Sequence, residues 1–201
     1  MLKLYDYLSS GNGYKVRLLL TQLGMPFERI ELDIERGETR TPDFLAKNPN
    51  GRIPTLELED GTFLPESTAV LFYLAEGTPY LSDDRLTRAQ TLGWMCFEQY
   101  SHEPYIATSR FIRMHTDMGD DQRRALEEKR APGYAALDVM ERHLGGHDFF
   151  AGGHYSIADI ALYAYTHVAE EGGFDLGGYP SIAAWLARVR GQPNHIPITQ
   201  G

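Results

Sequence analysis

The first 76 residues alternate between extended and helical patterns of apolar positions. LKLYDYL (2–8) has the short apolar and aromatic spacing of a strand, and KVRLLLTQLG (15–24) predicts a helix that ends at Gly24. FERIELDI (27–34) alternates apolar and charged residues, as a half-buried strand does. These stretches predict a strand, a helix and a second strand in that order.

A short helix, a hairpin and a further helix follow. Their segments are DFLAKNPNG (43–51), IPTLELED and TFLP around the turn Asp60-Gly61, and STAVLFYLAEG (67–77). The Asp-Gly pair suits a tight two-residue hairpin turn. Ser67 is the expected N-cap of the last helix, because serine side chains accept hydrogen bonds from the free N–H groups there. The predicted order is β-α-β-α-β-β-α.

From residue 85 onward the apolar spacing is helical. Four helical patterns occupy 85–115, 120–146, 156–173 and 181–193, and the first is expected to bend near Pro104. No strand pattern follows Phe63. The chain is therefore expected to contain an α/β domain over 1–76, a linker at 77–84 and an all-helical domain over 85–201.

Composition narrows the classes of protein that this chain represents. Apolar residues make up 42% and charged residues 23%, which is typical of a globular protein. The net charge of −9 argues against binding to nucleic acid or to an anionic membrane surface. No run approaches the roughly 18 apolar residues of a membrane span. The start of the chain lacks the apolar core of a signal peptide, and a single cysteine, Cys96, forms no internal disulfide, so the cytoplasm is the expected location.

The strongest local motif is NGRIPTLELEDGTFLPES, residues 50–67. If the Ile53-Pro54 peptide bond is cis, the backbone of Ile53 turns outward and can pair with an extended ligand. Glu66 and Ser67 stand at a predicted helix N-terminus, where free N–H groups and the helix dipole favour a carboxylate. Ser67 can donate to that carboxylate, and Glu66 can accept from an ammonium group. These groups suit a zwitterionic γ-glutamyl peptide, although a capping serine beside an exposed glutamate is an equally simple interpretation.

With these elements, the chain resembles a cytosolic glutathione transferase over nearly its whole length. NPNGRIPTLE and LPESTAVLFYLAE match the family's glutathione-site loop, cis-proline and acidic-serine pair, and the subtype suggested is a bacterial serine-type or nu/theta-like member. FFAGGHYSIADIALYAY matches the family's N-capping box, in which Ser156 and Asp159 have a structural role. The resemblance implies a thioredoxin-like first domain followed by an all-helical domain.

The resemblance also assigns residues to parts of glutathione. Ile53 would pair through its backbone with the cysteinyl part, Pro54 would be the cis-proline, and Glu66 and Ser67 would hold the γ-glutamyl end. Arg52 is the first candidate for the glycyl carboxylate, and a solvated loop arginine is the alternative. Lys15 and Lys47 are weaker candidates of the same kind.

The catalytic position lies in SSGNGYKV (9–16). Family members place a tyrosine, serine or cysteine near the end of the first strand, where a hydroxyl donates to the glutathione sulfur and lowers its pKa. No cysteine lies in the first 20 residues, which argues against the thiol-exchanging classes. Ser10 is ranked first, Ser9 second, and Asn12 is an additional amide donor, while Tyr7 stays open. The alternative is that these residues only form the turn and cap the helix.

The long first helix of the second domain offers a wall for the co-substrate. Glu98, His102, Tyr105 and Ser109 recur at spacings that place them on one face, and Arg113 lies nearby with Arg110. The electrophile-site candidates are His102, Tyr105, Ser109 and Arg113, with an inter-helix or dimer surface as the alternative. His102 lacks a second ligand at metal spacing, so no metal site is expected. Cys96, Trp94 and Trp185 are expected to be buried.

The predicted function is that of a glutathione transferase that stabilises the glutathione thiolate and transfers it to a small, hydrophobic electrophile. Glutathione would be a co-substrate, with no tightly bound cofactor, and the protein would be a homodimer that binds neither nucleic acid nor membrane. A glutathione-dependent peroxidase or disulfide reductase, or a non-catalytic glutathione-binding module, are the alternatives.

Overall fold

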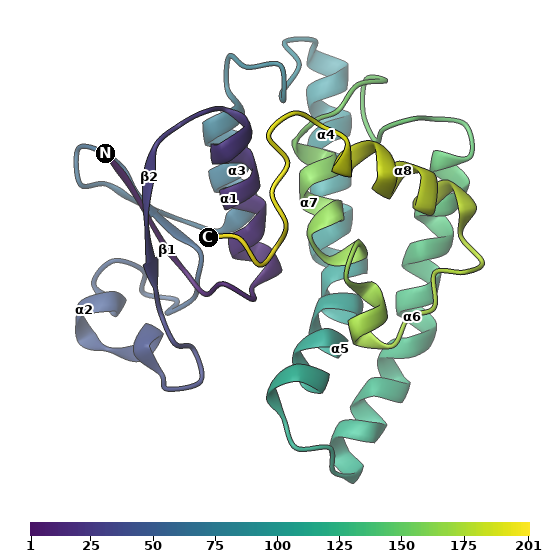
Figure 1. Ribbon diagram of the computed structural model, residues 1–201, viewed down its shortest axis with the longest axis horizontal. Helices are drawn as coiled ribbons and strands as arrows, with labels where there is room; N and C mark the ends of the chain where they lie inside the picture. Colours follow the sequence, from purple (N-terminus) through teal and green to yellow (C-terminus); the bar gives the residue numbers. More distant parts are fainter. The chain divides into compact units, whose positions relative to one another are not determined.

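The computed structural model describes all 201 residues, which form two compact units (Figure 1). The first contains Met1–Glu76 together with Pro193–Gly201, and the second contains Gly77–Gln192. The sequence pattern assigned the whole of 85–201 to the helical domain. The structure differs at the end of the chain, where the last nine residues belong to the first unit.

The first unit is built on a four-stranded mixed sheet with strand order β2-β1-β3-β4. Strand β1 (Leu2–Asp6) runs parallel to β2 (Phe27–Glu31) and antiparallel to β3 (Thr55–Glu57), and β3 pairs with β4 (Phe63–Pro65). The hairpin is present as predicted, but its loop closes between Leu58 N and Thr62 O, so the turn is longer than two residues.

The helices of this unit are α1 (Gly11–Gln22), a 3-10 turn η1 (Glu38–Arg40), α2 (Pro42–Leu45) and α3 (Ser67–Ala75). Helices α1 and α3 pack against each other (Figure 1). Helix α2 contacts β1 through the rings of Phe44 and Tyr5. The observed order of strands and helices agrees with the predicted one, and this is the expected thioredoxin-like arrangement.

The C-terminal segment returns to α1 through hydrogen bonds that the apolar pattern did not indicate. Tyr14 Oη donates to Ile196 O at 2.7 Å, and Arg17 Nη1 donates to Ile198 O at 3.1 Å. Ile196 is itself buried. These contacts explain why the last residues belong to the α/β unit, since both donors lie on α1.

The second unit is all-helical. Its elements are α4 (Arg85–Phe97), a π-helical turn η2 (Glu98–His102), α5 (Glu103–His115), α6 (Asp120–Leu144), α7 (Ile157–Thr166), a 3-10 turn η3 (Ala169–Gly172) and α8 (Pro180–Arg190). The π-helical turn η2 lies directly before the first turn of α5, which contains Pro104. Proline has no N–H to donate to the preceding turn, so the regular α-helical pattern is interrupted there.

Helix α7 is the centre of this unit, and all ten of its residues are buried. It begins with the predicted capping box: Ser156 N donates to Asp159 Oδ2 at 3.0 Å and Ala158 N donates to Ser156 Oγ at 3.3 Å. The Asp159 carboxylate also accepts from Trp185 Nε1, so it ties α8 to α7. Trp185 is fully buried, as expected.

Two expectations about the first helix of this unit were wrong. Cys96 is exposed, because Thr91 and Met95 form the buried face of α4 and Cys96 lies outside it. Trp94 is half-buried rather than part of the core, and it packs beside Phe97 and Phe150. None of the helices combines the length and the apolar composition that a membrane span requires.

Candidate functional site

The loop before β3 is held in a fixed shape by side-chain hydrogen bonds. The Ile53-Pro54 peptide bond is cis, as the resemblance implied. Asn48 Nδ2 donates to Arg52 O at 2.8 Å and to Thr55 Oγ1 at 3.1 Å, so it braces both ends of the loop. The backbone of Ile53 makes no hydrogen bond within the chain. Its polar groups are therefore free to pair with an extended ligand.

Glu66 has an unusual backbone conformation at the start of α3. Its φ of 68° and ψ of 111° are rare for a residue with a side chain, and its carboxylate is exposed without a partner. Such strain persists where the surrounding structure imposes it, and it is common at functional sites. Glu66, rather than Ser67, is the N-cap residue of α3, and no side chain caps this helix.

Ser67 therefore has a different role from the one expected of an N-cap. It is the first residue of α3, it is buried, and its Oγ donates to Asn12 Oδ1 at 3.2 Å. Lys15 Nζ donates to the same oxygen at 2.7 Å, and Lys15 is fully buried. The N-termini of α1 and α3 thus meet at a cluster that contains a hydroxyl, an amide and an ammonium group.

This cluster has the electrostatic character of an anion site. The first N–H groups of α3 have no partner within the helix, and the positive end of the helix dipole lies there. The buried Nζ of Lys15, which shares the acceptor Asn12 Oδ1 with Ser67, adds a further donor to the cluster. Lys15 was expected, as a weak candidate, at the glycyl end of the ligand. Its contact with Asn12 instead associates it with Ser67, the residue expected to hold the γ-glutamyl end.

Ser10 is the N-cap of α1, so its side chain has the capping role that the sequence left open. Gly13 N donates to Ser10 Oγ at 3.2 Å, which uses the oxygen as an acceptor and leaves the hydroxyl hydrogen to donate elsewhere. Ser9 instead has a hydrogen bond with the phenol of Tyr7. Burial raises the pKa of Tyr7, and the hydrogen bond from Ser9 offsets part of that rise.

The phenol of Tyr5 is hydrogen-bonded within the sheet and makes no hydrogen bond to the Ser9–Ser10 turn. Its Oη donates to Glu57 Oε2 at 2.7 Å, and burial together with that carboxylate raises the pKa of Tyr5 to about 12. The phenol of Tyr5 therefore stays protonated and paired at neutral pH.

The two remaining candidates for the glycyl carboxylate lie in different surroundings. Arg52 is exposed, its guanidinium group has no hydrogen-bond or ion-pair partner within the chain, and it directly precedes Ile53. Lys47 holds its ammonium group 5.3 Å from the centre of the Phe63 ring and 5.9 Å from that of Tyr5. This geometry favours Arg52, because Lys47 already has a cation–π environment.

Sequence reasoning missed an ion pair behind the turn. Arg17 Nε lies 2.8 Å from Asp6 Oδ2, both residues are fully buried, and Arg17 Nη2 donates to Leu8 O at 2.6 Å. A Cβ on Gly13 would lie 1.5 Å from Asp6 Oδ1, so only glycine fits there. The pair fixes the backbone that leads to Ser9 and Ser10. Arg17 reads as a surface residue in sequence, and its spacing from Asp6 gives no signal.

The electrophile-site candidates lie in the helical unit and do not converge on one point. His102 is fully buried, and its Nε2 lies 2.9 Å from Thr166 Oγ1, which favours a packing role. Tyr105 is half-buried on α5. Ser109 and Arg113 line one cavity with residues of α6 and the segment after η3. No group of three or more histidine, cysteine or acidic side chains has the arrangement of a metal site.

Two family models match the chain: "Glutathione S-transferase, N-terminal domain" over residues 1–76 and "Glutathione S-transferase, C-terminal domain" over residues 91–193. The crystal structure of a glutathione S-transferase from Pseudomonas fluorescens Pf-5 is 53% identical with a TM-score of 0.97, over 99% of both chains. Yeast Ure2p in complex with glutathione is 26% identical with a TM-score of 0.89, over 100% of this chain and 94% of that one. The disulfide-bond oxidoreductase YfcG from Escherichia coli is 30% identical, over 96% of this chain and 92% of its own length. The chain therefore belongs to the glutathione S-transferase family, as its motifs implied.

Proposed function

We propose that this protein binds glutathione in its α/β unit and transfers the glutathione thiolate to a small electrophile. The observation that carries the proposal is the cluster of Ser67, Asn12 and Lys15 at the meeting helix N-termini. It supplies donors and positive charge for the α-carboxylate of the γ-glutamyl residue. The exposed carboxylate of Glu66 is adjacent and suits the ammonium group of the same residue.

The neighbouring loop would bind the other two residues of glutathione. The unbonded backbone of Ile53 would pair with the cysteinyl residue, next to the cis Pro54, and Arg52 would attract the glycyl carboxylate. Bound glutathione in the Ure2p structure supports this assignment, because that relative shares the fold along the whole of this chain.

Ser10 is the proposed donor to the glutathione sulfur. Its oxygen accepts from Gly13 N, so its hydrogen is free to point toward a thiolate at the N-terminus of α1. A free thiol has a pKa near 8.5, and both the hydroxyl and the helix dipole favour the ionised form. In the reaction the thiolate attacks an electrophilic carbon, a new carbon–sulfur bond forms, and the leaving group departs with the electron pair. The thiol proton passes to solvent.

Disulfide or peroxide reduction is the second candidate, favoured by the oxidoreductase among the relatives. The single cysteine of the chain, Cys96, lies on the exposed face of α4 and not at the Ser9–Ser10 turn. A reductase reaction would therefore use two glutathione molecules and no protein thiol. Turnover of 1-chloro-2,4-dinitrobenzene, cumene hydroperoxide and bis(2-hydroxyethyl) disulfide, measured side by side, separates the two activities.

Glutathione binding itself is tested by calorimetric titration of the wild type and of Glu66→Gln. Removal of the carboxylate charge is expected to weaken glutathione about tenfold, as is usual for loss of one charge-assisted hydrogen bond. Glu59→Gln is the matched control, since that exposed carboxylate pairs with the N-terminus instead. Equal affinity in the wild type and Glu66→Gln would remove Glu66 from the site.

We also propose that the protein is a cytoplasmic homodimer. Large apolar side chains are exposed on the helical unit, and they include Leu92, Tyr100, Phe111 and Met114, with Tyr100 85% exposed. A partner surface would cover them. Light scattering after gel filtration should give twice the chain mass, and Tyr100→Glu should reduce it to the monomer.

A further inference from the structure

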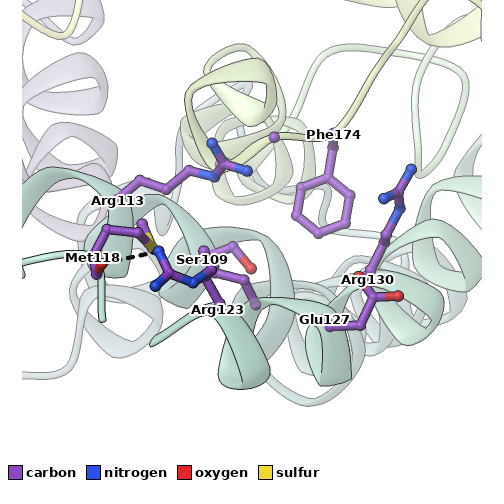
Figure 2. Close-up of a pocket in the computed structure, with 10 residues that line it drawn as sticks. Ser109, Arg113, Met118, Arg123, Glu127, Arg130 and Phe174 are labelled. Carbon is purple, nitrogen blue, oxygen red and sulfur yellow. Dashed lines mark hydrogen bonds between the residues drawn. The ribbon is translucent and has the colours of Figure 1, made fainter. Parts of the chain in front are cut away.

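A cavity of about 430 Å³ opens in the helical unit between α5, the first half of α6 and the segment that follows η3 (Figure 2). Its walls combine cations with apolar groups. Arg113 comes from α5, Arg130 from α6 and Phe174 from the segment after η3, while Met118 and Leu126 add apolar surface. A volume of this size is typical of sites for small molecules.

The cations of the cavity outnumber its acids. Arg113 and Arg130 are exposed and have no hydrogen-bond or ion-pair partner within the chain. Arg123 is engaged, because it pairs with Asp120 at 2.9 Å and donates to Met118 O. Glu127 is the one carboxylate among the lining residues. Two unpaired guanidinium groups at one cavity are unexpected on a chain whose net charge is −9.

The positions of these groups suit a flat ligand with an acidic group. Figure 2 shows the guanidinium groups of Arg113 and Arg130 on either side of the Phe174 ring. A Cβ on Gly173 would lie 2.5 Å from Arg113 Nη2, so the absence of a side chain there lets Arg113 lie against the backbone. Guanidinium groups bind carboxylates in a bidentate manner, and an aromatic ring favours stacking of a planar body.

The floor of the cavity has an unsatisfied polar group. Ser109 also lines the cavity, it is 1% exposed, and its Oγ has no hydrogen-bond partner in the chain. Buried hydroxyl groups are normally hydrogen-bonded, so an exception at a cavity points to a polar ligand. The unpaired guanidinium groups, the aromatic ring of the cavity wall and the unsatisfied hydroxyl therefore all indicate the same kind of ligand, a flat molecule with an acidic group.

We propose that this cavity binds a small organic anion with a planar or apolar body and a single carboxylate, held by Arg113 and Arg130 and packed on Phe174. Binding of such an anion does not depend on glutathione. Its identity as the electrophile of the reaction would rest on the proposed transferase function, because Ser109 and Arg113 were expected at the electrophile site.

The test is calorimetric titration with 1-naphthoate, without glutathione and without turnover, on the wild type and the Arg113→Gln/Arg130→Gln double variant. We expect saturable binding by the wild type and about tenfold or greater loss in the double variant. Arg124→Gln is the matched control, since Arg124 is an exposed arginine of α6 that does not line the cavity. It should bind as the wild type does.

Two further ligands define the chemical class. 1-Naphthamide, which has the ring but no charge, should bind at least tenfold more weakly than 1-naphthoate, and inorganic phosphate should not displace the naphthoate at equal concentration. No binding of 1-naphthoate, or equal affinity in the double variant, would overturn the proposal. If phosphate displaces the naphthoate, or if 1-naphthamide binds as tightly as 1-naphthoate, the ligand is not recognised as an organic carboxylate and the assigned chemical class is wrong. Glutathione titrations of the same variants report separately on the proposed function.

Discussion

Ser67 and Asn12 are 55 residues apart in the chain, yet Ser67 Oγ donates to Asn12 Oδ1 at 3.2 Å. The contact joins the first turn of α3 to that of α1. Lys15 donates to the same oxygen, so the amide holds two groups that a bound anion can use. On binding of a carboxylate, the Ser67 hydroxyl would turn from Asn12 to the ligand, while Lys15 keeps the amide in place.

A double-mutant cycle measures this coupling. Ser67→Ala should weaken glutathione about tenfold, and Asn12→Ala should weaken it to a similar extent by releasing Ser67 and Lys15. Because the residues share one hydrogen-bond network, the fold-loss of glutathione affinity in the double variant should be smaller than the product of the fold-losses in the two single variants. Calorimetric titration of the four proteins gives the coupling free energy. Strictly multiplicative losses would show that Asn12 does not position Ser67.

Ser10 has two roles, which substitutions can separate. Ser10→Ala loses both the cap of α1 and the donor to sulfur, and loss of an N-cap costs about 1 kcal/mol. Ser10→Gly loses the hydroxyl with only a few tenths of a kcal/mol in capping. Both variants should raise the pKa of bound glutathione, seen by ultraviolet absorbance of the thiolate across a pH titration, while the unfolding free energy falls mainly in Ser10→Ala.

Ser9→Ala is the matched control for that pair. Its hydroxyl is engaged with Tyr7, so the thiol pKa of bound glutathione should stay at the wild-type value. A raised thiol pKa in Ser9→Ala, with none in Ser10→Gly, would transfer the role to Ser9.

The Asp6–Arg17 pair is expected to stabilise the α/β unit strongly. Arg17→Met leaves the fully buried Asp6 without its cation and removes the donors to Leu8 O and Ile198 O. Breaking a buried ion pair in this way costs about 3–5 kcal/mol, measured by urea unfolding. Arg29→Met is the control, because its pair with Glu31 is partly exposed and contributes under about 1 kcal/mol. Equal losses in both variants would contradict the structural role of Arg17.

Asp159 should make stability depend on pH. Burial raises its pKa to about 6, although hydrogen bonds from Trp185, Phe150 and Ser156 oppose the rise. Because the raised pKa means that the folded state binds the proton more tightly, this group's stabilisation is present below about pH 4 and is lost as pH rises through 6. The loss would be at most about 3 kcal/mol.

Asp159→Asn removes that titration and leaves some of the four donors without an acceptor. We expect it to be destabilised, with a difference from the wild type that is larger at pH 4.5 than at pH 7. Urea unfolding at both values measures the two differences. If the difference in unfolding free energy between the wild type and Asp159→Asn is larger at pH 7 than at pH 4.5, the hydrogen bonds to Asp159 affect its pKa more than burial does, and that pKa is lowered.

Much of the fold and part of the candidate site were accessible from local patterns. Period-two and helical spacing predicted the strand and helix order of the α/β unit, because one buried face imposes that periodicity on each element. The capping box at Ser156 and Asp159 was accessible for a similar reason, since its hydrogen bonds span three residues. The cis Ile53-Pro54 bond was implied by family resemblance and not by spacing, and the strained backbone of Glu66 was not predicted at all.

The tertiary structure alone decided the contacts between distant segments. Ser67 was expected to cap its own helix, and instead its hydroxyl contacts Asn12 of α1. The sequence pattern contained no signal for Arg17 and Asp6 and made Lys15 a weak candidate for the glycyl carboxylate, yet all three are fully buried with partners. The C-terminal segment, which the sequence places in the helical domain, is held to α1 by Tyr14 and Arg17. The sequence by itself thus determined elements and motifs, because backbone propensity and one-sided burial are local. Partner choice among polar side chains depends on which helix ends the packing brings together, and only the tertiary structure decides that.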